Sequence, residues 1–174
     1  FYVDSDVHKV LESMCYALQI DPMGDQEIID GQQYIRDKLE EWIPYYVDAQ
    51  EENGYFDTYF ILGANGNTPK WWDFNLHELY CAGHFYEAAV AHYRATNGQD
   101  TRLFDMAIKN ADYVCSLFGE GKWKQVPGHQ EIELALVKLA NLCNEIGGEY
   151  AEKAQNYITL AEFFLDTRGD YEGR

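Results

Sequence analysis

Hydrophobic residues recur along most of this chain at the spacing that places them on one face of an α-helix. Six helical segments are predicted, at about residues 5–19, 28–46, 75–96, 103–118, 129–144 and 151–165. The run from Asp21 to Gly24 ends the first segment, since proline and glycine interrupt helices. The pattern therefore predicts an all-α fold.

The predicted helices are of two kinds. Residues 75–96 and 129–144 are apolar on nearly every side, whereas residues 103–118 and 151–165 carry a single apolar stripe. A helix that is apolar all round must be covered on all sides, while a striped helix meets water on one face. Inner and outer helices are therefore expected to alternate.

This alternation groups the helices into hairpins, each made of an inner helix followed by an outer one. The three hairpins are predicted at about residues 5–52, 75–118 and 128–167, within one all-α segment that covers residues 1–174. Helical hairpins repeating at intervals of roughly 50 residues are typical of an α/α toroid or an α-solenoid rather than a four-helix bundle.

Two links between hairpins are candidates for function. Residues 53–74 form a long link rich in tyrosine, phenylalanine and tryptophan, and the shorter link 119–128 contains Trp123. Links longer than about 12–15 residues within a compact domain are usually functional. Both links are expected at the end of the helix layers where the inner helices begin.

Side chains suited to a sugar gather at that end. Aromatic rings offer apolar faces to the C–H faces of sugars, and the amino terminus of a helix favours a neutral imidazole, which can both donate and accept a hydrogen bond. The predicted sugar-binding set is His77, His129, Glu78, Gln130, Trp72 and Tyr59. The alternative, in which the aromatic rings anchor the loop and the histidines cap helices, stays open.

Composition and charge narrow the classes of partner. With 174 residues, of which 47% are hydrophobic, the chain can form one domain with a sizeable core. Its 30 acidic and 13 basic residues give a net charge of −17, which repels nucleic acids and anionic membranes. No segment approaches the ~20 continuous apolar residues that span a bilayer.

A metal site within this stretch is not expected. His77, Cys81 and His84 have the spacing i, i+4, i+7, but the outer two are separated by about 10 Å along a helix, too far to share one ion. Cys81 and His84 are instead predicted to be core positions. The cysteines fall singly inside apolar stretches and are predicted to be free thiols, at Cys15, Cys81, Cys115 and Cys143.

Four ordered blocks of sequence carry a resemblance to a known family. DSDVHKVLE, NGYFDTYF, HELYCAGHFYEAAVAHYRATN and PGHQEIELALVKLA occur in this order, at residues 4–12, 53–60, 77–97 and 127–140. Together they resemble the catalytic domain of glycoside hydrolase family 127, the β-L-arabinofuranosidases, and its close relative family 146. The similarity extends over essentially the whole chain.

The resemblance implies an (α/α)6 barrel that hydrolyses terminal β-L-arabinofuranosyl linkages with retention of configuration. It also implies that His77 and His129 contact the sugar. The family's nucleophile is a cysteine bound to zinc, which three cysteines and a glutamate hold, and another glutamate is the acid/base. The chain contains no Glu-x-Cys element and no Cys-Cys pair.

The expected molecule is therefore part of a catalytic domain, about half of the barrel. It supplies some of the sugar-binding wall but not the nucleophile, the acid/base or the zinc ligands, and is expected to be inactive by itself. Exposed flanks of its inner helices would favour self-association. The resemblance leaves localisation open, with the bacterial periplasm or exterior slightly favoured over the cytoplasm.

Two rival functions stay open at this point. One is a non-catalytic module of helical hairpins that binds glycans or peptides. The other is a different glycosidase or lyase of the α/α-toroid class, which would use carboxylates without zinc, and Glu78 with Glu131 is the pair that composition offers.

Overall fold

The computed structural model describes residues 1–64, 66 and 68–169, and its regular elements are helical. The elements are α1 (Val3–Leu18), α2 (Gln26–Ala49), the short α3 (Thr58–Ile61), the 3-10 helix η1 (Phe74–Leu76), α4 (Glu78–Ala95), α5 (Arg102–Leu117), α6 (Ile132–Ile146) and α7 (Gly148–Gly169). An isolated β-bridge joins Phe118 to Trp123. The prediction of an all-α fold is confirmed.

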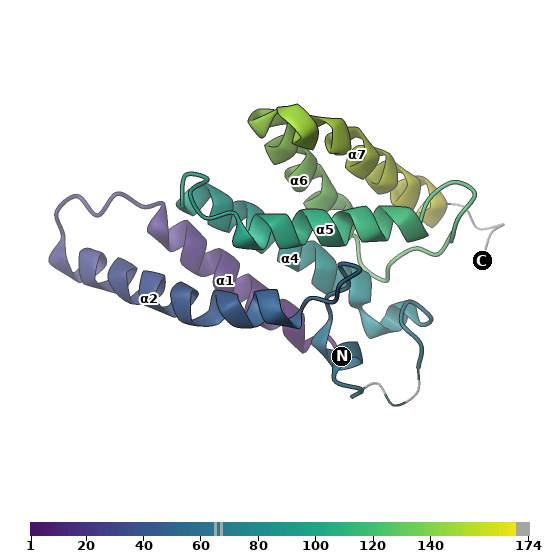
Figure 1. Ribbon diagram of the computed structural model, residues 1–174, viewed down its shortest axis with the longest axis horizontal. Helices are drawn as coiled ribbons and strands as arrows, with labels where there is room; N and C mark the ends of the chain where they lie inside the picture. Colours follow the sequence, from purple (N-terminus) through teal and green to yellow (C-terminus); the bar gives the residue numbers. More distant parts are fainter. Residues whose placement is uncertain (65, 67, 170–174) are drawn as a thin grey trace.

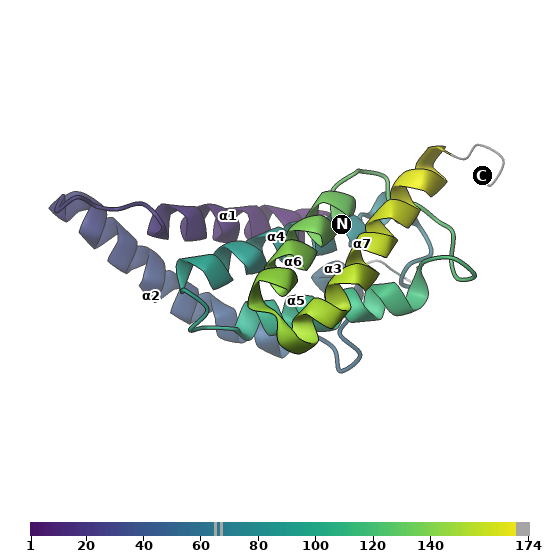
Figure 2. The same cartoon turned by 90° about the horizontal axis from the view of Figure 1, so that it is seen from above.

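The long helices form two rows. In one row α1 packs against α4 and α4 against α6, and in the other α2 packs against α5 and α5 against α7. Each helix of the first row also packs against the next long helix in the chain, so that three successive hairpins lie side by side. Figures 1 and 2 show this succession from two directions. The predicted alternation of inner and outer helices is confirmed.

Helix α4 lies at the centre of this arrangement. It contacts α1, α5 and α6, and most of its side chains are buried, including Leu79, Phe85 and Tyr86, which are at most 2% exposed. The small side chains of the alanines at 82, 88, 89 and 91 allow the neighbouring helices to pack close to the backbone of α4. This explains why residues of α4 are apolar on every side.

The beginning of the long link is fixed to the outer row. Asn110 of α5 donates from Nδ2 to the carbonyl oxygen of Gly54 at 2.7 Å, and Gln50 donates to the same oxygen at 3.0 Å. Gly54 has φ +96°, and a Cβ there would lie 2.5 Å from the carbonyl oxygen of Lys109. Only glycine fits this position, which directs the following aromatic residues toward the inner row.

Apolar side chains are exposed at the two ends of the inner row. Val7 and Val10 of α1 are 41% and 49% exposed, and Leu134 and Val137 of α6 are 52% and 38% exposed. Self-association through these flanks stays a prediction.

Among the described helices, none combines the length and the hydropathy that crossing a bilayer requires.

A buried histidine couples α1 to the aromatic core. His8 is 3% exposed, shares a 3.0 Å hydrogen bond between Nδ1 and the Tyr46 hydroxyl, and packs against the rings of Tyr46, Phe56 and Phe85. Burial, with smaller contributions from His84 and Lys9, lowers the pKa of His8 to about 3. His8 is therefore neutral in the folded chain at any ordinary pH.

We expect His8 to make the fold sensitive to acid. The unfolded chain binds a proton at His8 below about pH 6.5 and the folded chain does not, so the His8 contribution to stability is complete above pH 6.5 and falls by about 1.4 kcal/mol per pH unit below it. In urea unfolding between pH 7 and pH 4.5, His8→Gln should lose less stability than the parent chain. Equal losses in the two proteins would contradict this assignment.

Candidate functional site

His77 lies at the junction between η1 and α4. The helix predicted from Asn75 is interrupted there, because His77 has a left-handed backbone with φ 66° and ψ 20° and α4 begins only at Glu78. The imidazole Nδ1 lies 2.5 Å from the carbonyl oxygen of Asn75. Since a carbonyl oxygen only accepts, Nδ1 of His77 carries the proton, and neutral His77 presents Nε2 as an acceptor.

His129 lies in the turn before α6. The predicted helix start at His129 is wrong, because α6 begins at Ile132. Its Nε2 is 3.2 Å from Nε2 of His77, although the two residues are 52 positions apart. When both rings carry the tautomers that this arrangement favours, His129 donates its Nε2–H to Nε2 of His77. The structure thus brings the two predicted histidines together.

The contact between the histidines depends on a close approach of α4 and α6. A Cβ on Gly83 of α4 would lie 2.8 Å from Cγ of Glu131 and 3.0 Å from the backbone of Ile132. Glycine at this position therefore lets the start of α6 rest directly on α4, six residues after His77 in the chain.

Aromatic rings surround the His77–His129 pair. Tyr80 lies with its ring centroid 5.5 Å from that of His77 and 5.1 Å from that of His129. Phe1 lies 5.1 Å from the ring of His77 and 6.3 Å from that of Tyr59, which brings the predicted Tyr59 to the edge of the same group. Tyr2 and Tyr80 were not among the sequence candidates, because ring packing across separate helices leaves no local signal.

Glu78 is placed behind the pair rather than in front of it. It is 4% exposed, and its two oxygens accept hydrogen bonds from the Tyr55 hydroxyl at 2.5 Å and the Trp71 backbone N–H at 2.7 Å. Burial raises the pKa of Glu78 to about 7 against the opposite effect of these donors. Glu78 is therefore buried, holds Tyr55 and Trp71 through its two oxygens, and anchors the long link.

The remaining predicted residues lie at the surface. Gln130 is exposed next to His129. Trp72 is 73% exposed and lines a groove of about 320 Å³ with Trp71 and Trp123. Neither imidazole of the His77–His129 pair lines this groove. The two aromatic links therefore meet at the same end of the molecule, but Trp72 faces Trp123 instead of the histidines.

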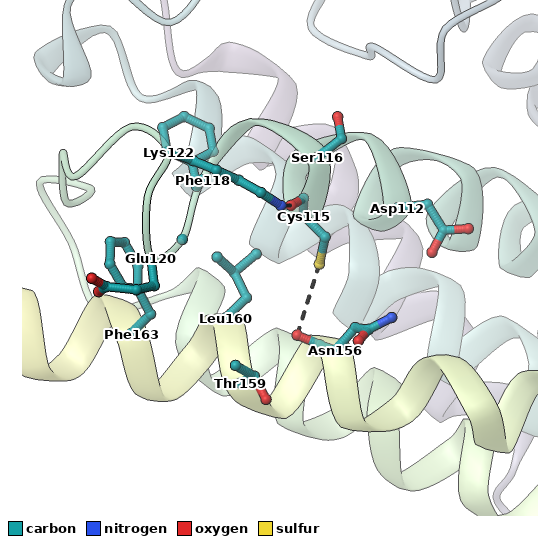
Figure 3. Close-up of a pocket in the computed structure, with 11 residues that line it drawn as sticks. Asp112, Cys115, Ser116, Phe118, Glu120, Lys122, Asn156, Thr159, Leu160 and Phe163 are labelled. Atoms are coloured by element: carbon teal, nitrogen blue, oxygen red, sulfur yellow. Dashed lines mark hydrogen bonds between the residues drawn. The ribbon is translucent and has the colours of Figure 1, made fainter.

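A larger groove of about 460 Å³ lies between α5 and α7 in the outer row. Figure 3 shows its walls, with Asp112 and Cys115 on α5 facing Asn156 and Leu160 on α7. None of the predicted sugar-binding residues lines it. This groove is separate from the candidate site.

Sequence reasoning missed a charged cluster below the pair. The prediction that His84 is a plain core position is wrong, because its Nδ1 lies 3.2 Å from Glu131 and 3.9 Å from Glu87, and Lys138 contacts Glu87. Burial and the neighbouring Glu87 raise the pKa of Glu131. The i, i+3 spacing of His84 and Glu87 is visible in the sequence, but their contact with Glu131 is not, because Glu131 comes from another hairpin. Glu131 and Glu78 belong to separate networks.

Comparison with known proteins identifies the family. A family model described as "Beta-L-arabinofuranosidase, GH127 catalytic domain" matches residues 2–172. The chain belongs to the GH127 family. Its four ordered blocks and its alternating helical rows agree with this assignment.

Individual GH127 relatives agree with the family match. A non-reducing end β-L-arabinofuranosidase from Bifidobacterium longum subsp. longum is 36% identical over 97% of this chain. The crystal structure of a GH127 β-L-arabinofuranosidase from Geobacillus stearothermophilus T6 has a TM-score of 0.74 and 39% identity over 98% of the chain. A second GH127 β-arabinofuranosidase structure has a TM-score of 0.76 at 34% identity and 95% coverage.

These GH127 relatives are much longer than the chain. It spans 23% of the length of the Bifidobacterium protein and 24% of each of the two solved chains. The family assignment therefore holds for this stretch, and the activity of a complete protein is a matter for proposal.

The cysteines of this GH127 chain do not fit the zinc centre that the sequence resemblance implies. They lie on four different helices, and three of them are at most 1% exposed, namely Cys15, Cys81 and Cys143. Burial raises the pKa of Cys15 to about 12 and that of Cys143 to about 11. Zinc binds thiolates, so protonated thiols buried on separate helices are unsuitable ligands.

The Gly83 contact gives a direct test of the packing. Gly83→Ala should destabilise the chain by about 1–3 kcal/mol, because the added methyl group forces α6 away from α4. Gly31→Ala is the matched control, since Gly31 lies in α2 with nothing within 4 Å of its Cβ position, and it should stabilise the chain by up to about 1 kcal/mol. Urea unfolding measures both, and equal effects of the two substitutions would refute the close approach.

Proposed function

We propose that this chain is part of the catalytic domain of a retaining glycoside hydrolase that releases terminal β-L-arabinofuranosyl residues from plant-type glycans. Its membership of the GH127 family supports the class of enzyme. Its relatives from Bifidobacterium and Geobacillus are β-L-arabinofuranosidases, which supports the substrate class. The observation that carries the role of this stretch is the 3.2 Å contact between His77 and His129.

The histidine pair offers one donor and one acceptor to a sugar. A hydroxyl group that enters between the rings can donate to Nε2 of His77 and accept from the Nε2–H of His129, so it replaces the contact that the two nitrogens make with each other. Because the carbonyl of Asn75 fixes the proton on Nδ1 of His77, this direction is built into the site. The pair is thus suited to one hydroxyl rather than to a charged group.

The other predicted residues take supporting roles in this proposal. Glu78 holds Tyr55 and Trp71 behind His77, and so fixes the loop that ends at the site. Tyr59 packs against Phe1, which packs against His77, and Gln130 is exposed beside His129, so both are proposed to contact the sugar ring and its hydroxyls. Trp72 lines a groove with Trp123 that the histidines do not line, and this groove would take a neighbouring part of the glycan.

The bond-breaking groups are proposed to lie outside these 174 residues. Retaining hydrolysis needs a nucleophile and an acid/base on either side of the anomeric carbon. The carboxylates that composition suggested do not form such a pair, since Glu78 is held by Tyr55 and Trp71 while Glu131 faces His84. A zinc-bound thiolate, when present, supplies the nucleophile, and this chain contributes the binding and orientation of the sugar.

The chain by itself is expected to release no arabinose from a β-L-arabinofuranosyl substrate, because it lacks a nucleophile paired with an acid/base. The assay is release of arabinose by the purified 174-residue chain. Turnover that His129→Ala abolishes would show that the catalytic groups are within this stretch and would overturn the division of roles.

In the intact protein, as its natural reading frame encodes it, His77→Ala and His129→Ala should each lower kcat/KM by about a hundredfold or more, because each removes a hydrogen bond that positions the reacting sugar. Gln33→Ala, on the exposed face of α2, is the control and should leave kcat/KM unchanged. Sugar binding without hydrolysis in the intact protein would favour a non-catalytic glycan-binding module instead.

A further inference from the structure

Tyr80 contacts three imidazoles at once. It follows His77 by one turn of α4, and its ring centroid lies 5.5 Å from that of His77, 5.1 Å from that of His129 and 4.5 Å from that of His84. The contacts with His77 and His84 are close to perpendicular, at 88° and 87°. Edge-to-face packing of this kind restrains the orientation of both partners.

The Tyr80 hydroxyl is held from another helix. Lys9 of α1 donates from Nζ to the Tyr80 hydroxyl at 3.0 Å and to Oγ of Ser5 at 3.3 Å. This hydrogen bond to Tyr80 is the main cause that raises the pKa of Lys9, so the ammonium group stays charged and the bond persists across the neutral range. The phenol therefore cannot turn without breaking a contact between α1 and α4.

The contacts of Tyr80 close into a ring around His77. Ser5, which is fully buried, donates to the carbonyl oxygen of Tyr2 at 2.8 Å, and the Tyr2 side chain packs against His77 at 5.8 Å. The path from His77 through Tyr80, Lys9, Ser5 and Tyr2 thus returns to His77. A displacement of any one member changes the place of the imidazole.

His129 depends on Tyr80 even more strongly. It is exposed and lies in a turn, outside the helical hydrogen bonding of α6. Within the described part of the chain, the imidazole of His129 contacts His77 and Tyr80. Tyr80 is the one of these two that a sugar would not displace on entering between the histidines.

We infer that Tyr80 is a positioning residue, which holds the imidazoles of His77 and His129 at the separation that admits a sugar hydroxyl, with Lys9 of α1 fixing its phenol. The inference rests on the proposed function for its consequence in catalysis. The structural part of the inference is that the Tyr80 ring positions the two imidazoles, and this part requires no substrate. Tyr80 acts through the histidines and transfers no proton itself.

The test uses the intact protein and L-arabinose as the probe of binding. Tyr80→Phe keeps the ring and loses the hydrogen bond from Lys9, so it should weaken binding about threefold, whereas Tyr80→Leu removes the ring and should weaken it about tenfold or more. In a His129→Ala background, Tyr80→Leu should cause little further loss, since the group that it positions is gone. Calorimetric titration measures each dissociation constant.

A matched control separates positioning from general loss of a tyrosine. Tyr16→Phe removes a tyrosine hydroxyl on α1, which donates to Glu12 at 2.7 Å, and should leave the affinity for L-arabinose unchanged. If Tyr80 positions the histidines through its ring, the affinity for L-arabinose should rise from Tyr80→Leu to Tyr80→Phe and be highest in the parent protein.

A second readout needs no sugar. The imidazole ¹⁵N signals of His77 and His129 should both shift in Tyr80→Leu and remain close to those of the parent protein in Tyr16→Phe, because the contact between the two Nε2 atoms is lost only in the former. Unchanged imidazole signals in Tyr80→Leu, with unchanged affinity while His129→Ala loses binding, would overturn the inference and leave the proposed function standing. If the parent protein binds no arabinose, the proposed function fails and the ¹⁵N spectra alone decide the role of Tyr80.

Discussion

Helix α4 has apolar or small side chains around its whole circumference, and the free energy gained by removing them from water fixes the places of α1, α5 and α6. The small residues among them decide how near the neighbours come. At Gly83 the start of α6 rests on the backbone of α4. This approach brings His129 to His77, so the candidate site is a consequence of burying one helix.

Carboxyl groups are buried near the start of α4, and their burial controls their protonation. Asp57 and Glu78 have pKa values raised to about 7, and burial is the main cause in both. Glu78 compensates for its burial by accepting from Tyr55 and Trp71, and it thereby ties the long link to the start of α4. A chain with a net charge of −17 thus keeps individual carboxyl groups in its interior as structural acceptors.

The pattern of apolar residues predicted most of the fold, because the buried positions of a helix recur at a spacing that is visible in a single sequence. The apolar circumference of residues 75–96 predicted an inner helix, and the contacts of α4 agree. Helix starts were misplaced by three residues at Asn75 and His129. The left-handed backbone of His77 delays α4, and nothing in a histidine signals that conformation, while His129 lies in a turn before α6.

The only part of the site that the sequence predicted is the pair of histidines that occupy equivalent positions on successive inner helices. His77 and His129 share such positions, whereas the burial of Glu78 depends on Tyr55 and Trp71, loop residues whose placement no periodicity reveals. His84 was misassigned for the same reason, since its partner Glu131 comes from another hairpin. Contacts between hairpins require the packing of α4 on α6, which the sequence does not display.

The central claim is that the His77–His129 pair receives a sugar hydroxyl between its two Nε2 atoms. A crystal structure of the intact protein with L-arabinose bound tests it most directly. The account predicts a sugar hydroxyl within hydrogen-bond distance of Nε2 of His77 and Nε2 of His129, with the 3.2 Å contact between them opened. Arabinose bound in the groove of Trp72 and Trp123, with that contact intact, would contradict it.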